Sequence, residues 1–139
     1  MMDLDCLKKV NDTHGHDAGD AALRRVGGLL SHQLRSEDFL SRYAGDEFVA
    51  LVRIGAVEVR ELIQRLQQAV DDYRFEAGGS SMGLGISVGW ACFGADGESI
   101  DELLLAADHA MYADKLRRKV ALSLSEDPQA VQADQCRVM

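Results

Sequence analysis

The chain has 139 residues, of which 47% are hydrophobic and 27% charged; this allows one globular domain and argues against a fibrous or wholly disordered protein. Its 15 Lys and Arg residues and 23 Asp and Glu residues give a net charge of −8, so there is no global positive field to hold DNA or RNA. A phosphate-bearing ligand would need local lysines, backbone amides or a metal ion.

The composition predicts a cytoplasmic protein without a membrane segment. No apolar run approaches the ~20 residues that a membrane-spanning helix needs. The first ten residues already include two aspartates and two lysines, which argues against a secretory leader. The three cysteines are scattered without a C-x-x-C spacing, which argues against a disulfide framework or a zinc site and fits a reducing compartment.

The first third of the chain predicts a strand followed by a helix. Residues 1–7 are typical of the end of a strand that runs into a turn. Asp17, with Asp20 at the third helical position, predicts a helix start, because a carboxylate can accept hydrogen bonds from the free N–H groups of a first turn. Apolar residues then recur at helical spacing up to Leu34, which indicates one buried face.

The middle of the chain predicts a hairpin and a second helix. Residues 39–43 and 47–52 are short runs rich in aromatic and aliphatic residues, and Ala44-Gly45-Asp46 between them is typical of a β-hairpin turn. An apolar stripe over residues 59–73 predicts a helix, which the Gly-Gly-Ser-Ser segment at 78–81 separates from the next element.

The last third predicts a strand over residues 84–93 and one more helix. The Ser99-x-x-Glu102 capping box opens this helix, and its apolar residues continue to Met111. The periodicity ends after about Val120, so we expect residues 121–139 to form a polar, flexible tail.

This order of elements predicts an α+β fold, the ferredoxin-like βαββαβ arrangement with an extra C-terminal helix. We expect one antiparallel sheet with helices on one face. The first strand lies in the middle of such a sheet, and its loss would deprive both neighbours of hydrogen-bond partners. Because the chain begins only two residues before Asp3, we expect residues 1–120 to form an N-terminally truncated domain, or one whose fold is compromised.

Two short motifs place carboxylates where they could do chemistry. Asp3 and Asp5, two apart on a strand, point to one face, and such a strand end can hold Mg²⁺. Asp46 and Glu47 follow a small-residue pair on the hairpin, where they can bind a metal or accept a proton. Alone, the first motif is more typical of a solvated strand end, and the second is equally typical of a plain turn.

Taken together, the motifs resemble the GGDEF domain family over most of the chain. This family comprises diguanylate cyclases and their degenerate relatives. The resemblance rests on five segments in order: residues 3–12 (DLDCLKKVND), 15–20 (GHDAGD), 42–48 (RYAGDEF), 86–89 (ISVG) and 107–115 (ADHAMYADK). It implies a nucleotidyl cyclase palm-like fold that here lacks the usual N-terminal helix and first half-strand. Ala44 stands where the first glycine usually stands; it adds strain if that position needs a positive φ and is harmless otherwise.

The resemblance implies a metal-dependent catalytic centre. Asp3, the backbone carbonyl of Leu4 and the carboxylate of Asp46 would bind Mg²⁺ or Mn²⁺. Asp46 or Glu47 would assist deprotonation of the attacking 3′-hydroxyl, and the sequence does not decide between them. Lys8 would stabilise charge on the phosphates.

The resemblance also implies a set of substrate contacts. Asn11 and Asp20 would hydrogen-bond the guanine edge, with His16 nearby. Lys115 would reach the terminal phosphates, and Lys119, at the place of a family arginine, could still bind phosphate. Each has a plain alternative: a turn for Asn11, a helix cap for Asp20 and a solvated surface for the lysines.

A further motif, Arg35-Ser36-Glu37-Asp38, resembles the family's inhibitory R-x-x-D site, where the product binds and shuts the enzyme down. Arg35 suits this role because a guanidinium forks onto phosphate or a guanine edge. The alternative is an ordinary salt bridge between Arg35 and Asp38 at a helix end, which contributes little when exposed.

The function implied by the resemblance is condensation of two GTP into cyclic di-GMP with release of pyrophosphate. Because the product is two-fold symmetric and each domain would hold one GTP, a symmetric homodimer is implied. Two other hypotheses stay open: a non-catalytic domain that binds GTP or cyclic di-GMP, and an inactive fragment. The presence of all three acids, Asp3, Asp46 and Glu47, favours the enzyme over a module that only binds.

Overall fold

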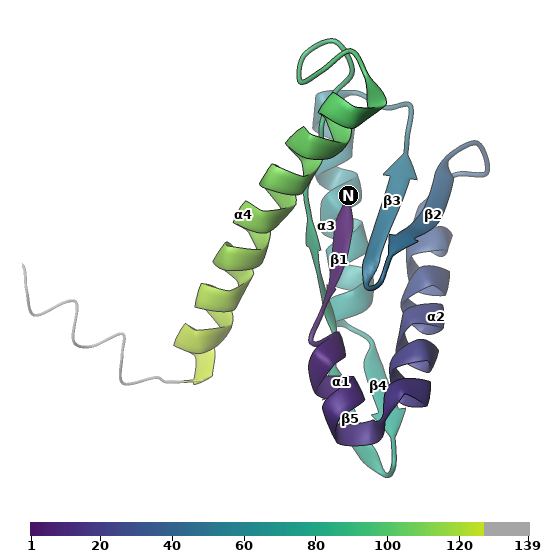
Figure 1. Ribbon diagram of the computed structural model, residues 1–139, viewed down its shortest axis with the longest axis vertical. Helices are drawn as coiled ribbons and strands as arrows, with labels where there is room; N and C mark the ends of the chain where they lie inside the picture. Colours follow the sequence, from purple (N-terminus) through teal and green to yellow (C-terminus); the bar gives the residue numbers. More distant parts are fainter. Residues whose placement is uncertain (127–139) are drawn as a thin grey trace, which may run out of the picture.

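The computed structural model describes residues 1–126 and consists of a four-stranded antiparallel sheet, a separate two-stranded hairpin and four helices in that part of the chain (Figure 1). The sheet order is β2-β3-β1-β6. In chain order the elements are β1 (Met2–Asp5), α1 (Leu7–His14), α2 (His16–Gln33), β2 (Phe39–Ala44), β3 (Glu47–Leu51), α3 (Ala56–Asp71), β4 (Arg74–Ala77), β5 (Ser80–Gly83), β6 (Gly85–Val88) and α4 (Ile100–Glu126). The α+β architecture with an added C-terminal helix is confirmed.

The short first strand lies in the middle of the sheet, as predicted. β1 has four residues, yet it pairs on both sides: Asp3 lies opposite Glu47 of β3 and opposite Ser87 of β6. β6 pairs with β1 along its whole length. β3 pairs with β1 only at Glu47 and Phe48, so the rest of β3, residues 49–51, has no β1 residue opposite it and is paired on the β2 side alone.

The helices cover both faces of the sheet, so the expectation that all helices lie on one face is wrong. Met2 and Leu4 of β1 belong to one buried cluster with residues of α2 and α3, including Val26 and Leu62. Side chains alternate along a strand, so Asp3 points to the opposite face, where α4 packs on β6 and β1 (Figure 1). Strand alternation thus places acids under α4 and apolar residues under α2 and α3.

Local structure differs from the sequence prediction in four places. Helix α2 begins at His16 with Gly15 as its N-cap, so Asp17 lies in the first turn and does not cap the helix. The segment after β1 is helix α1 rather than a turn, and Gly15, at φ 85°, separates it from α2. The strand predicted over residues 84–93 is confined to Gly85–Val88. Gly78 and Gly79 both have positive φ and connect the additional hairpin β4–β5, because a tight two-residue turn of this hand requires that conformation.

Helix α4 continues past the point where the apolar pattern ends. Residues 121–126, which the sequence analysis assigns to the tail, are helical. Neither glycine nor proline interrupts the sequence from Ile100 to Glu126, so the backbone can remain helical without a buried face. The rest of the predicted tail, 127–139, lies outside the described residues. In the described part of the chain, no helix combines the length and apolar character required to span a membrane.

Candidate functional site

The β2–β3 hairpin turn fixes the position of the two adjacent acids. Gly45 adopts φ 41°, and its carbonyl accepts a 2.8 Å hydrogen bond from Nε of Arg42. The backbone N–H of Leu4 donates a 3.0 Å bond to the carbonyl of Asp46, which ties the turn to the central strand. Within residues 1–126, Cys6 is the one residue other than glycine with positive φ, so Ala44 carries no such strain.

One pocket opens between the turn and α4, with a volume of about 440 Å³. Asp3 and Glu47 line it from the sheet, and Asp108, Tyr112 and Lys115 line it from the helix. The Lys115 ammonium lies 2.6 Å from Oδ1 of Asp3, which is itself only 7% exposed. An acid predicted to hold a metal and a lysine predicted to bind phosphate, 112 positions apart, thus meet in one place.

Negative charge accumulates in this pocket around a single lysine. Burial raises the pKa of Glu47, and the negative charges of Asp3, Asp46 and Asp108 raise it further. Burial acts to lower the pKa of Lys115, but its hydrogen bond to Asp3 and the surrounding carboxylates outweigh this, so the pKa of Lys115 is raised. The carboxylates therefore repel one another, and a bound cation would relieve that repulsion.

Asp5, the second acid of the strand motif, does not line the pocket; its carboxylate instead bonds to other residues of the fold. Its carboxylate accepts a 2.9 Å hydrogen bond from the buried hydroxyl of Ser87 and lies 3.4 Å from Nε of Arg118. Burial raises its pKa, with a smaller contribution from the charge of Asp3. Its partners in the fold distinguish it from Asp3, although both point to the same face.

A second pocket, of about 430 Å³, lies between α1, α2 and the hairpin turn. It is lined by the two residues predicted to hydrogen-bond guanine and the histidine expected nearby, together with the predicted phosphate-binding lysine and one turn acid: Asn11, Asp20, His16, Lys8 and Asp46. Gly19 allows the close approach of α1 and α2 here, because a Cβ on Gly19 would collide with the side-chain amide of Asn11.

The two pockets meet at the hairpin turn. Asp46, in the turn, lines the pocket at α1 and α2, while Glu47, the first residue of β3, lines the pocket at α4. Asp3 shares its pocket with Glu47 rather than with Asp46. The charges of Asp3 and Asp46 nevertheless act on the same groups, Glu47 and Lys115, which places both acids around one region.

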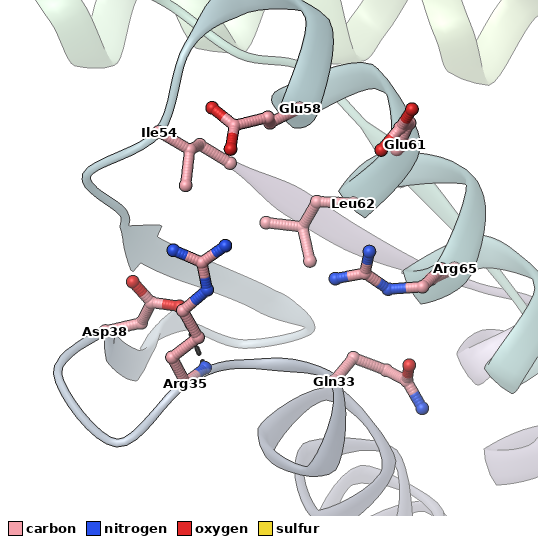
Figure 2. A pocket seen from close by; sticks show the side chains of 8 residues that line it. All are labelled: Gln33, Arg35, Asp38, Ile54, Glu58, Glu61, Leu62 and Arg65. Carbon is pink, nitrogen blue, oxygen red and sulfur yellow. Dashed lines mark hydrogen bonds between the residues drawn. The ribbon is translucent and has the colours of Figure 1, made fainter.

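A third pocket surrounds the Arg35–Asp38 motif (Figure 2). The backbone N–H of Arg35 donates a 2.9 Å hydrogen bond to Oδ2 of Asp38, which closes the loop after α2. In Figure 2 the guanidinium groups of Arg35 and of Arg65, on α3, point into the same space. Arg65 has no recognisable signal in the sequence, because it is one of several charged residues on the exposed side of a helix.

The remaining predicted site residue, Lys119, is placed differently. It is an exposed residue of α4, one turn beyond Lys115. Within the described part of the chain, Lys119 is not one of the residues that line these three pockets. Asp108 and Arg42 were not among the predicted site residues either, although they line the first and second pockets. Both lie within the quoted motifs, so motif membership was the available signal.

Comparison with known proteins adds three findings. The family model described as "Diguanylate cyclase, GGDEF domain" matches residues 1–120. Diguanylate cyclase A of Treponema denticola is 32% identical over 133 residues, which is 94% of this chain and 36% of that protein. The probable diguanylate cyclase DgcE of Escherichia coli is 38% identical over 131 residues, 94% of this chain and 12% of that protein. The chain therefore spans only a minor part of these curated relatives.

Two solved structures share the fold. A sensory box/GGDEF family protein from Caulobacter crescentus superposes with a TM-score of 0.76 at 33% identity, covering 84% of this chain and 76% of that one. The GGDEF domain of DgcB from the same organism, solved in complex with c-di-GMP, has a TM-score of 0.72 at 27% identity and covers 82% and 68% of the two chains.

Proposed function

Since the chain belongs to the GGDEF domain family, we propose that it condenses two GTP molecules into cyclic di-GMP and pyrophosphate, using a divalent cation. The observation that carries this proposal is the meeting of two pockets at the Asp46–Glu47 turn. One offers an amide and a carboxylate suited to the guanine edge, at Asn11 and Asp20. The other offers carboxylates and Lys115, suited to a cation and phosphates.

The residues present fit Mg²⁺ or Mn²⁺. Within residues 1–126 no three His, Cys, Asp or Glu side chains form a ligand cluster of their own. Mg²⁺ does not require one, because it binds through one or two carboxylates and keeps water and substrate phosphates as its other ligands. Asp3, Asp46 and the carbonyl of Leu4 would hold the ion. When bound, it would neutralise charge on the reacting and leaving phosphates.

The protein's own groups would orient the substrate and move a proton. Asn11 and Asp20 would fix the guanine and, with it, the ribose 3′-hydroxyl. Lys115 neutralises Asp3 in the structure, and release of that ion pair would free its ammonium for the terminal phosphates. Either Asp46 or Glu47 would take the proton of the 3′-hydroxyl; the raised pKa of Glu47 would make its carboxylate a stronger base than an ordinary glutamate.

Two copies would act together, each with one GTP, because the product is two-fold symmetric. The test is incubation of the purified 139-residue chain with GTP and Mg²⁺, followed by chromatography for cyclic di-GMP and an assay for pyrophosphate. Both products are expected. Binding of GTP or cyclic di-GMP without turnover would instead support a non-catalytic module, and neither binding nor turnover would support an inactive fragment.

Replacing Gly19 by Ala is expected to reduce the preference for GTP over ATP. The added Cβ forces the Asn11 amide to move, while the helix itself tolerates Ala well. Loss of the hydrogen bonds from one amide corresponds to about tenfold in the ratio of kcat/KM for GTP to that for ATP. Gly28→Ala is the control, since among the described residues nothing lies within 4 Å of its added Cβ. An unchanged preference in both Gly19→Ala and Asn11→Ala would mean that guanine is read elsewhere.

Product inhibition is proposed at the Arg35 pocket. Arg35→Ala and Arg65→Ala are each expected to raise the cyclic di-GMP concentration for half-inhibition about tenfold or more, because each removes charged hydrogen-bond donors. Initial rates at increasing added cyclic di-GMP measure this. Arg60→Ala, elsewhere on α3, is the control and should leave inhibition unchanged. Equal inhibition of all variants would remove this pocket from regulation.

A further inference from the structure

The outer edge of β6 is bonded by side chains instead of a neighbouring strand. Gly89 and Met1 exchange backbone hydrogen bonds, with N–H of Gly89 donating to the carbonyl of Met1 at 2.9 Å. In an antiparallel ladder, residues that hydrogen-bond to the neighbouring strand alternate with residues whose backbone N–H and C=O point away from it. In β6 the backbone N–H and C=O of Val88 and Ile86 therefore point away from β1. These are groups that a further strand would otherwise bond.

Gln67 of α3 and Asp114 of α4 bind these two groups, and we call the pair the edge clamp. Val88 N–H donates to Oδ2 of Asp114 at 2.9 Å, and Nε2 of Gln67 donates to the Ile86 carbonyl at 3.3 Å. Nε2 of Gln67 also donates to the same Oδ2 at 2.9 Å. The clamp therefore joins a helix on one face of the sheet to a helix on the other across the open edge.

The clamp fixes α4 immediately beside a residue of the proposed site. Asp114 is followed directly by Lys115, which contacts Asp3 at 2.6 Å. The Asp114 side chain is short, only 14% exposed and bonded to backbone, so it restricts both rotation and sliding of the helix. Arg118, one turn further along α4, contacts Asp71 at 2.6 Å and Asp5 at 3.4 Å. Its side chain is long and can follow small movements of the helix, so these contacts fix the helix register less tightly than the short Asp114 side chain does.

We propose that Gln67 and Asp114 are positioning residues for Lys115: by closing the β6 edge they hold α4 in the register that directs the Lys115 ammonium into the pocket with Asp3. This rests on the proposed function, in which Lys115 binds the terminal phosphates of GTP. The proposal gives a functional role to Gln67 and Asp114, although neither is among the described residues that line the two substrate pockets.

The experiment compares Asp114→Ala and Gln67→Ala with Asp114→Asn, whose amide oxygen can still accept from Val88. Arg117→Ala is the matched control, because Arg117 also bonds Asp114, at Oδ1 and 3.1 Å, but takes no part in the clamp. Three quantities are measured on the full chain: hydrogen exchange of the Val88 amide by NMR, the rate of Lys115 acetylation by mass spectrometry, and KM and kcat for GTP.

In Asp114→Ala we expect Val88 to exchange about tenfold faster or more, since it loses a hydrogen bond to a charged group. Lys115 should be acetylated several-fold faster, and the KM for GTP should rise about tenfold, with kcat changed much less. Gln67→Ala should move the same quantities in the same direction, and Asp114→Asn and Arg117→Ala should stay near wild type.

Faster Val88 exchange with unchanged Lys115 acetylation would overturn the proposal, because the clamp would then protect the edge without positioning the lysine. An unchanged KM in an active protein would overturn it as well. If the wild-type chain does not turn over GTP, the proposed function fails, yet Val88 exchange and Lys115 acetylation still decide whether the clamp positions the lysine.

Discussion

Asp46→Asn is expected to lower kcat for cyclic di-GMP synthesis about 1,000-fold, because it removes one of two carboxylates proposed to hold the cation at the reacting phosphates. The fold should survive. Asp46 contributes to the sheet through its backbone carbonyl, which accepts from Leu4, and the substitution leaves that group in place. Turnover is measured at saturating GTP and Mg²⁺, and unfolding in urea should stay within about 1 kcal/mol of wild type.

Glu76→Gln is the control for charge alone. Glu76 is an exposed residue of β4, and its neutralisation removes the same unit of charge from the protein. If Asp46→Asn and Glu76→Gln are equally active, Asp46 has no part in the mechanism. Glu47→Gln, measured in parallel over pH, decides which acid accepts the proton, since the variant without the base loses the acidic limb of the pH–rate profile.

Gly89→Ala is expected to destabilise the protein by about 3 kcal/mol or more, at the upper end of overpacking substitutions. A Cβ at this position would overlap the backbone of α4, at the carbonyl of Ala107 and the N–H of Met111. Backbone cannot rotate away as a side chain can, so α4 must move off the sheet. Urea unfolding followed by circular dichroism measures the change in the free energy of unfolding.

The same substitution should also disrupt the pocket, because α4 carries Lys115 to Asp3. We therefore expect faster Lys115 acetylation together with the lower stability. Gly28→Ala is the matched control: its Cβ has free space among the described residues, and it should stabilise by about 0.5–1 kcal/mol through helix propensity. A Gly89→Ala protein as stable as Gly28→Ala would show that α4 does not pack on Gly89 as described.

Much of the fold follows from local patterns. The β2–β3 hairpin was predictable because a turn-forming Ala-Gly-Asp separates two short apolar runs, and α3 because its apolar residues recur at helical spacing. The hairpin β4–β5 was missed, since Gly78-Gly79 marks a turn but the flanking strands have mixed, half-exposed residues without clear alternation. The face covered by α4 was also missed, because apolar spacing shows that a helix has a buried side but not what covers it.

For the candidate site, the sequence alone determined which chemical groups are present. It also determined that most of them lie in motifs of one family, and that these motifs follow one another in the family's order. The tertiary structure alone decided how they are grouped: Asp3 with Glu47 and Lys115, Asp46 with Asn11 and Asp20, and Arg65 beside Arg35. The physical reason is that local spacing fixes only which way a side chain projects from its own element. Which distant side chains share a pocket depends on strand register and on the close helix contacts at Gly19 and Gly89.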